Sequence, residues 1–147
     1  MKLLLLHVDF LEFAVTKKTK YAEPVEDSAK HGRMEEALVA FIAAERSDEE
    51  ALDAVAQGAA DVIRDVATKV ATNKVVLYPY AHLSSDLASA PKAVDVIRGI
   101  ECLLTGYDVL RAPFGWYKSF NLKCKGHPLS ELSRTVAPRS TAEPCSQ

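Results

Sequence analysis

Two histidines lie where binding and catalytic groups are often found. His82 and His127 fall in short segments rich in small and turn-forming residues, 80–85 and 125–128, and loops at strand ends commonly carry sites. An imidazole in such a loop can act as a general acid or base near neutral pH. The alternative is a hydrogen-bonded structural group. No two histidines have the spacing of a zincin helix.

Lys118 is an unusual residue for its local pattern. It alternates in phase with Trp116 and Phe120, which predicts that its ammonium points toward the apolar face of a strand. A lone ammonium is costly there unless it lines a polar pocket. Either Lys118 lines such a pocket, or a bulge or an extended stem brings its charge to water. These features indicate a possible site near His82, Lys118 and Glu131.

Nucleophilic and metal chemistry find little support in the sequence. Cys124 alternates with residues of an apolar strand, which favours a packed thiol over a nucleophile. Cys102, Cys124 and Cys145 are widely spaced and contain no Cys-x-x-Cys pair, so we expect neither a disulfide framework nor a structural zinc site. Neither a Gly-x-Ser-x-Gly motif nor a phosphate-binding glycine loop occurs. We therefore expect no metal and no cofactor.

Charge limits the contacts that the chain can make with nucleic acid. The 147 residues carry 18 Lys and Arg against 20 Asp and Glu, a net charge of −2, so no global positive field attracts phosphates. The segment 111–134 holds five bases and one acid and is the candidate anion-facing stretch. The alternative is a set of solvated surface charges that happen to cluster.

Length and composition are those of a single domain that can bury a hydrophobic core. The chain has a mass of 16.1 kDa and is 48% hydrophobic and 26% charged. Its N-terminal apolar run is short and is followed by Asp9 and Glu12, which fits neither a signal peptide nor a membrane span. We expect a cytoplasmic protein.

Local patterns predict strands first and helices later. An apolar run at 2–8 and an alternating segment at 11–15 predict an N-terminal hairpin. The charged segment 17–33 is expected to be an exposed loop, and the apolar segment 36–44 favours a buried strand, with a helix as the alternative.

The second half predicts two helices between further strands. A capping-box pattern at Ser47 and Glu50 precedes helical periodicity through Val70, and a second helix is expected from Ser89 to Gly106. Further strands are expected at three short segments, 74–80, 109–112 and 116–124.

This order predicts an α/β domain in which helices cover one side of a mixed sheet. The boundaries expected are a domain at 1–137 and a flexible tail or the start of a linker at 138–147, where prolines recur among few large apolar residues.

Five segments carry a resemblance to a known family. They are LLLLHVDF at 3–10, GRMEEALVAF at 32–41, YPYAHLSS at 78–85, APFGWYK at 112–118 and CKGHPLSELSR at 124–134. In this order they resemble the N-terminal editing domain of archaeal threonyl-tRNA synthetase. The resemblance implies a fold like that of D-aminoacyl-tRNA deacylases and hydrolysis of mischarged L-seryl-tRNA(Thr).

The resemblance also implies roles for particular residues. Its catalytic positions fall on Lys118, His82, Tyr117 and Glu131, and its substrate-binding positions on Pro79, Tyr80, Ala81, Phe114 and Gly115. Lys118 would stabilise charge on the ester carbonyl, Glu131 and Tyr117 would hold the serine hydroxyl and water, and His82 would order the loop that meets the ribose. The 2′-hydroxyl of the terminal adenosine would help to activate the water.

Implied partners are the 3′ end of tRNA(Thr) carrying serine, a second copy in a homodimer, and the catalytic part of the synthetase. Trp116 and Tyr80 stand where relatives are expected to have tyrosine and phenylalanine, and both keep an aromatic ring. Two other functions stay open, a D-aminoacyl-tRNA deacylase and a non-catalytic tRNA-binding or dimerisation appendage. Editing within a synthetase or in trans is also open.

Overall fold

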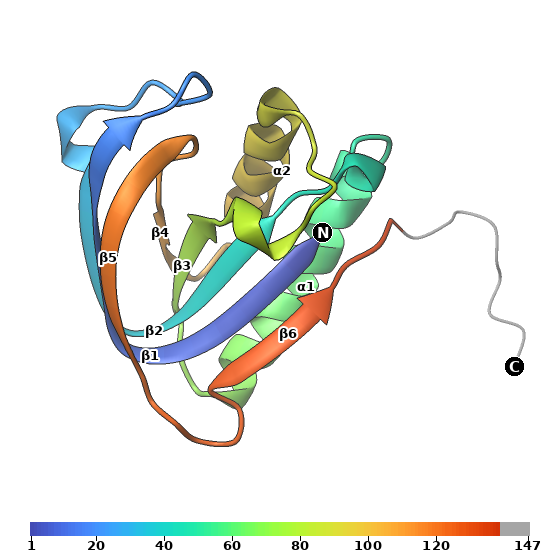
Figure 1. The fold of residues 1–147 in the computed structure, drawn as a ribbon. Coiled ribbons are helices and arrows are strands. Elements are labelled where there is room, and N and C mark those ends of the chain that lie inside the picture. The colour runs from blue at the N-terminus through green and yellow to red at the C-terminus, as the bar shows by residue number, and fades with distance from the viewer. Residues whose placement is uncertain (139–147) are drawn as a thin grey trace, which may run out of the picture.

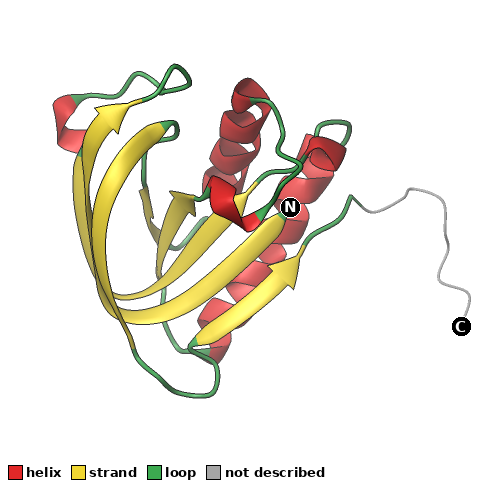
Figure 2. Ribbon diagram, in the orientation of Figure 1, coloured by secondary structure: helices red, strands yellow, loops and turns green. Residues whose placement is uncertain are grey.

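The computed structural model describes residues 1–138 as a six-stranded sheet with two helices (Figures 1 and 2). The strands are β1 (Lys2–Lys18), β2 (His31–Ala43), β3 (Lys74–Pro79), β4 (Asp108–Arg111), β5 (Trp116–Cys124) and β6 (Glu131–Thr135). The helices are α1 (Leu52–Lys69) and α2 (Ala90–Leu103), with 3-10 turns η1 (Asp27–Ala29), η2 (Arg46–Asp48) and η3 (Ala81–Leu83).

The sheet mixes parallel and antiparallel pairs. Its order is β4-β3-β2-β1-β5, and β6 also pairs with β1. β2, β3 and β4 are parallel to one another, and α1 and α2 make the two connections that parallel neighbours require. β2, β5 and β6 each run antiparallel to β1. The mixed α/β fold predicted from the sequence is confirmed.

Both helices cover the same face of the sheet, as predicted (Figure 2). Apolar residues recur in α1 at helical spacing, so that Val55, Ala59, Ile63 and Val66 are all buried. α2 has Pro91 in its first turn and buries Val96, Ile97 and Ile100. These side chains pack on alternate residues of the central strands to form the larger core. No helix among residues 1–138 is long and apolar enough to cross a membrane.

The other face of the sheet is covered by neither α1 nor α2 and curls into a concave surface, which we call the concave face; the short turn η3 packs against it through Leu83. Its buried residues are Val8, Leu11, Phe13, Ala37, Val39, Phe41, Val76, Tyr78 and Ala112. In a flat sheet β3 and β5 would lie about 14 Å apart, three strand spacings. The ring centroids of Tyr78 on β3 and Phe120 on β5 are 5.4 Å apart, so the sheet folds its two sides toward each other (Figure 1).

The predicted N-terminal hairpin is wrong. β1 is one strand of 17 residues, which pairs along its first part with β6 and along its second part with β5. The apolar pattern changes phase between the segments 2–8 and 11–15. In the structure this change corresponds to an irregularity in the pairing with β5 between Val8 and Phe10.

Three smaller predictions also differ from the structure. The capping box lies at Glu45 and Asp48 on η2, whereas Ala51 precedes α1 without a side-chain cap. The segment 17–33 is not wholly exposed, since it contains the buried Glu23 and the start of β2. β6 was not predicted, because Leu132 is its only half-buried residue and leaves no clear alternation. In the predicted tail, residues 139–147 lie outside the described part of the chain.

Asp48 organises the corner where β1, β2 and η2 meet. Its carboxylate is fully buried and accepts hydrogen bonds from the amino group of Met1 at 3.0 Å and from the backbone N–H of Glu45 at 2.7 Å. The Met1 amino group also donates to Val136 O at 2.8 Å. A buried ion pair of this kind becomes costly when one partner is removed.

We therefore expect Asp48→Ala to lower the free energy of unfolding by about 3 to 5 kcal/mol, because it leaves the amino group of Met1 buried beside fewer acceptors. Urea unfolding at pH 7 measures this loss. Glu50→Ala, at an exposed position nearby, is the control and should change stability by about 0.5 kcal/mol or less. Equal effects of the two substitutions would contradict the role of Asp48.

Candidate functional site

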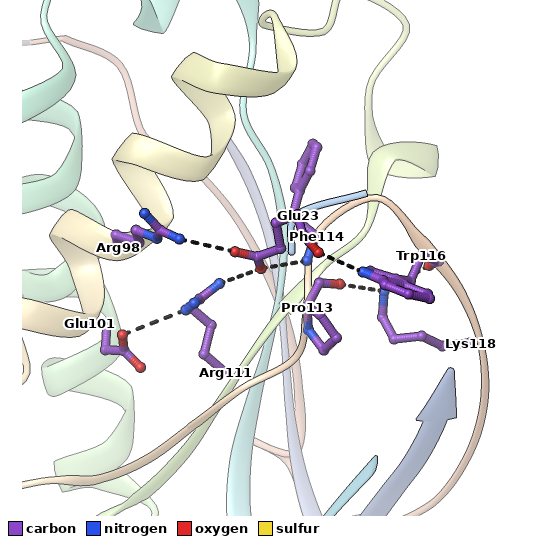
Figure 3. Close-up of polar contacts among 8 residues, drawn as sticks. All are labelled: Glu23, Arg98, Glu101, Arg111, Pro113, Phe114, Trp116 and Lys118. Atoms are coloured by element: carbon purple, nitrogen blue, oxygen red, sulfur yellow. Dashed lines mark hydrogen bonds and ion pairs between the residues drawn. The ribbon is translucent and has the colours of Figure 1, made fainter. Parts of the chain in front are cut away.

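Lys118 lies on the concave face, where its ammonium is held by backbone and ring. Nζ donates hydrogen bonds of 2.9 Å to Pro113 O and of 2.9 Å to Trp116 O, and it lies 5.1 Å from the centroid of the Tyr78 ring. Figure 3 shows Lys118 turned back toward the 113–116 turn. An ammonium has three N–H donors, so two accepted bonds within residues 1–138 leave one N–H for an incoming oxygen.

The environment of Lys118 weakens its hold on the proton. Burial lowers the pKa of Lys118 to about 8, and the negative charge of Glu23 opposes part of that shift. The pocket interpretation of the sequence pattern is therefore the one that fits, since carbonyl oxygens and an aromatic face provide the polar lining. At neutral pH this residue is a positive charge held largely away from water.

An aromatic cluster forms the wall beside Lys118. Phe41 lies with its ring centroid 5.1 Å from Tyr78, 5.2 Å from Tyr80 and 5.9 Å from Phe120. Burial raises the pKa of Tyr78 to about 12, so this phenol stays neutral across the physiological range. Phe41 and Tyr78 are each only 3% exposed, whereas Phe120 is 42% exposed and Tyr80 is half-buried, so Phe120 and Tyr80 are the rings on which a planar base could stack. Sequence reasoning missed Phe41, Tyr78 and Phe120 as site residues, since their spacing alone indicated core.

The segment that follows β3 borders the same wall. Pro79 ends β3, and the Tyr80 N–H donates to Ile42 O at 2.8 Å. Ala81 and His82 belong to the short turn η3, in which the imidazole of His82 is exposed and lies 5.3 Å from the Tyr80 ring. The structure thus connects His82, Tyr80 and Lys118 through a continuous run of ring contacts.

Glu131 lies at the start of β6 on the concave face. It pairs with Leu6 of β1, whose side chain packs against the cluster of that face, whereas the next residue, Leu132, packs against the helices. Its side chain is exposed, and Cys124 Sγ lies 3.7 Å from Glu131 Oε1. Cys124 is a half-buried strand thiol, as predicted. The structure gives no direct contact between Glu131 and Lys118.

A pair of histidines holds the loop that leads to Glu131. The Leu129 N–H donates to His127 Nδ1 at 3.1 Å, so His127 Nε2 carries the proton that reaches His7 Nδ1 at 2.7 Å. Burial, followed by the charges of His127 and Lys125, lowers the pKa of His7. His127 is therefore a structural group of this loop, which is the alternative that the sequence left open.

Tyr117 does not join the other predicted residues. Neighbouring residues of a strand point to opposite faces, so Tyr117 lies on the face of β5 opposite to Lys118, and it is 62% exposed. Phe114 and Gly115 form the turn before β5. Gly115 has φ of +81°, and a Cβ at this position would lie 2.3 Å from Tyr21 O, so only glycine fits.

The basic stretch 111–134 does not form one anion-facing surface. Arg111 pairs with Glu23 at 2.6 Å and Lys125 pairs with Asp9 at 2.6 Å, while Lys118 points inward. Adding charges along the sequence could not reveal these pairings. Within residues 1–138 no group of three or more His, Cys, Asp or Glu side chains could hold a metal ion.

The assembled geometry suits charge stabilisation more than nucleophilic attack. A partly desolvated ammonium with a free N–H can stabilise an oxygen on which negative charge develops. Near it are the aromatic cluster, the exposed imidazole of His82 and, further along the same face, the carboxylate of Glu131. No contact among residues 1–138 pairs a nucleophile with a base and an orienting third group. A reaction at this face would therefore depend on water and on groups of the substrate.

The chain is similar to a known protein family and to several known proteins. Residues 1–136 match the family described as the archaea-specific editing domain of threonyl-tRNA synthetase. Threonine–tRNA ligases of Methanosarcina acetivorans and Methanothrix thermoacetophila are 54% identical over 144 residues and 56% identical over 137 residues. These matches cover 97% and 92% of this chain but 23% and 22% of those proteins.

A third relative, the threonine–tRNA ligase of Methanocaldococcus jannaschii, is 54% identical over 138 residues, which are 92% of this chain and 22% of that protein. The chain thus spans less than a quarter of the length of the curated relatives it matches. Since the family match extends over nearly all of the described residues, this chain belongs to the family of archaea-specific editing domains of threonyl-tRNA synthetase.

Proposed function

We propose that this chain proofreads threonine attachment by hydrolysing the ester of L-seryl-tRNA(Thr). The observation that carries the proposal is the Lys118 ammonium, held by Pro113 O and Trp116 O over the Tyr78 ring with one N–H free. Membership of the editing-domain family supports a proofreading role. Editing is needed because serine lacks one methyl of threonine, and a difference of that size gives a synthesis site only about 1 to 3 kcal/mol of discrimination.

In the proposed reaction, water adds to the ester carbonyl and the carbon–oxygen bond to the terminal ribose then breaks. Negative charge develops on the carbonyl oxygen, where the free N–H of Lys118 donates to it. The 2′-hydroxyl of the terminal adenosine accepts the proton of the water and gives its own proton to the departing 3′-oxygen, so that the ribose leaves with its 3′-hydroxyl restored. Serine and tRNA leave as separate products. The protein mainly positions the reacting groups.

We infer the roles of the other predicted residues from their positions. Glu131, on the concave face, would hold the serine hydroxyl or the water. His82, exposed beside the Tyr80 ring, would order the turn η3 that meets the ribose, with Ala81 in that turn and Pro79 at the end of the strand before it. Tyr117 lies on the outer face of β5, so we propose that it contacts the tRNA and not the water.

Contacts with the tRNA backbone are proposed at the far end of β1. Lys17, Lys18 and Lys20 are exposed there, and Lys18 pairs with Trp116 at the start of β5. Three exposed lysines provide only a few phosphate contacts, consistent with a net charge of −2. A homodimer, association with the catalytic part of the synthetase and a cytoplasmic location stay predictions.

Lys118→Met should reduce single-turnover hydrolysis of L-seryl-tRNA(Thr) by about 10² to 10³-fold, the usual effect of losing one donor to a developing oxyanion. Release of labelled serine measures the rate. Lys123→Met removes an exposed lysine of the same strand and should keep the normal rate.

The same assay separates the competing functions. A D-aminoacyl-tRNA hydrolysed faster than the seryl substrate would favour a D-aminoacyl-tRNA deacylase. Turnover of neither ester would favour a non-catalytic appendage. A normal rate for Lys118→Met would overturn the role of Lys118.

The pH dependence of the reaction should follow the charge of Lys118. Because burial lowers the pKa of Lys118 to about 8, the ammonium is present below that pH and is lost as the pH rises through it. After spontaneous hydrolysis is subtracted, kcat/KM should fall above about pH 8. Lys118→Arg keeps its charge and should remove this fall, whatever its own rate. A rate that keeps rising to pH 9.5 would instead indicate a neutral amine acting as base.

Replacing the 2′-hydroxyl of the terminal adenosine by hydrogen, in a 3′-seryl ester, should slow hydrolysis far more than it weakens binding, since that hydroxyl is proposed to act on the water. Single-turnover rates and equilibrium binding on the same substrates measure the two effects. Equal losses would move the base onto the protein, with His82 as the first residue to substitute.

A further inference from the structure

Glu23 is a buried carboxylate far along the sequence from Lys118, in a loop expected to be exposed. The residue is 6% exposed. Its Oε1 accepts hydrogen bonds from Arg111 at 2.6 Å and from the Phe114 N–H at 2.7 Å, and its Oε2 accepts one from Arg98 at 3.3 Å. Figure 3 shows these partners converging on the carboxylate from α2, from the end of β4 and from the following turn.

The backbone of Glu23 also makes hydrogen bonds to the 113–116 turn. Its N–H donates to Phe114 O at 2.9 Å, and its carbonyl accepts from the indole N–H of Trp116 at 3.0 Å. Nearby, the Thr19 N–H and Oγ1 donate to Gly115 O at 3.0 and 2.7 Å. The 113–116 turn is therefore fixed on one side by the loop that contains Glu23.

The other side of this turn holds the Lys118 ammonium. Two of its carbonyls, Pro113 O and Trp116 O, accept the two hydrogen bonds of Nζ. A movement of the turn would move both acceptors at once. Because Gly115 sits in the left-handed region against Tyr21 O, the turn also depends on close contact with the loop.

We propose that Glu23 is a positioning residue for Lys118, acting through the 113–116 turn that its carboxylate and backbone clamp. This inference rests on the proposed function, since it assumes that Lys118 acts on the ester. Glu23 does not touch the substrate in this scheme. It fixes the two carbonyls that aim the ammonium, and its negative charge favours the protonated form of Lys118.

Charged and titratable groups from several elements surround Lys118 and Glu23. Lys118 faces the Tyr78 ring of β3 and experiences the negative charge of Glu23. Glu23 is bordered by Arg98 of α2 and Arg111 of β4, and Glu101 of α2 lies 3.5 Å from Arg111. Neutralising Glu23 removes an anion that raises the pKa of Lys118, so the ammonium should then lose its proton at a lower pH.

The test compares Glu23→Gln with Glu26→Gln, which makes the same chemical change at an exposed position of the same loop. Glu23→Gln keeps an oxygen for the Phe114 N–H but removes the charge. We expect kcat for hydrolysis of L-seryl-tRNA(Thr) to fall at least tenfold with KM little changed, and the fall in kcat/KM with rising pH to begin at a lower pH. Glu26→Gln should match the unmodified chain in all three quantities.

A second readout does not depend on activity. In protein labelled with ¹³C-lysine, the ε-carbon signal of Lys118, assigned by its absence in Lys118→Met, should titrate at a lower pH in Glu23→Gln than in Glu26→Gln. Glu23→Asp keeps the charge and shortens the side chain by one methylene. It should lower kcat while leaving the Lys118 titration close to normal, and it also provides the test if Glu23→Gln does not fold.

The outcomes separate this inference from the proposed function. If Lys118→Met hydrolyses the substrate at the normal rate, the assigned role of Lys118 fails, whatever Glu23 does. If Lys118→Met is inactive while Glu23→Gln keeps both normal kcat and normal Lys118 titration, only the role of Glu23 is overturned. Equal losses in Glu23→Gln and Glu26→Gln would also overturn it.

Discussion

A positive charge held on an apolar surface is the constraint on which the candidate site depends. The Lys118 ammonium has left most of its hydration, and two backbone carbonyls and one aromatic face replace the water. The carbonyls come from the 113–116 turn and the ring comes from β3. The carbonyls need a tight turn before β5, and the ring needs β3 to lie across from β5. Gly115 allows the tight turn, and the curl of the sheet brings β3 across from β5.

The two faces of the sheet have different roles. One face is covered by α1 and α2 and carries the larger core, which stabilises the domain by apolar burial. The concave face is covered by neither α1 nor α2, and Phe120, His82 and Glu131 are exposed on or beside it. A ligand can therefore approach the concave face without displacing any part of the main core. This separation lets the sequence of the concave face serve binding while the other face maintains the fold.

Local pattern predicted the helices and central strands because their apolar periods are long and regular, as in α1 from Val55 to Val66. It failed where a residue depends on distant partners. The three groups that surround the Glu23 carboxylate lie 75, 88 and 91 residues away in sequence, and no local signal marks such a residue as buried.

For the candidate site, alternation correctly predicted that Lys118 faces the apolar side. The resemblance implied catalytic roles for both Tyr117 and Lys118, which are adjacent residues of one motif. Neighbours on a strand face opposite ways, so a motif read as a string could not tell which residue meets the concave face. The aromatic wall was equally hidden, since Phe41 and Phe120 become neighbours only when the sheet curls.

The unbroken course of β1 limits how such a domain can diverge. Both β6, with Glu131, and β5, with Lys118, take their register from this one strand. Because side chains alternate with a period of two, losing a single residue near its middle would exchange inner and outer positions beyond that point. Phe13 would turn outward and a charged neighbour, Glu12, would enter the aromatic cluster. Insertions and deletions should therefore accumulate in loops such as the one at Gly106, where a Cβ would meet nothing within 4 Å. The length of β1 should stay constant among related sequences.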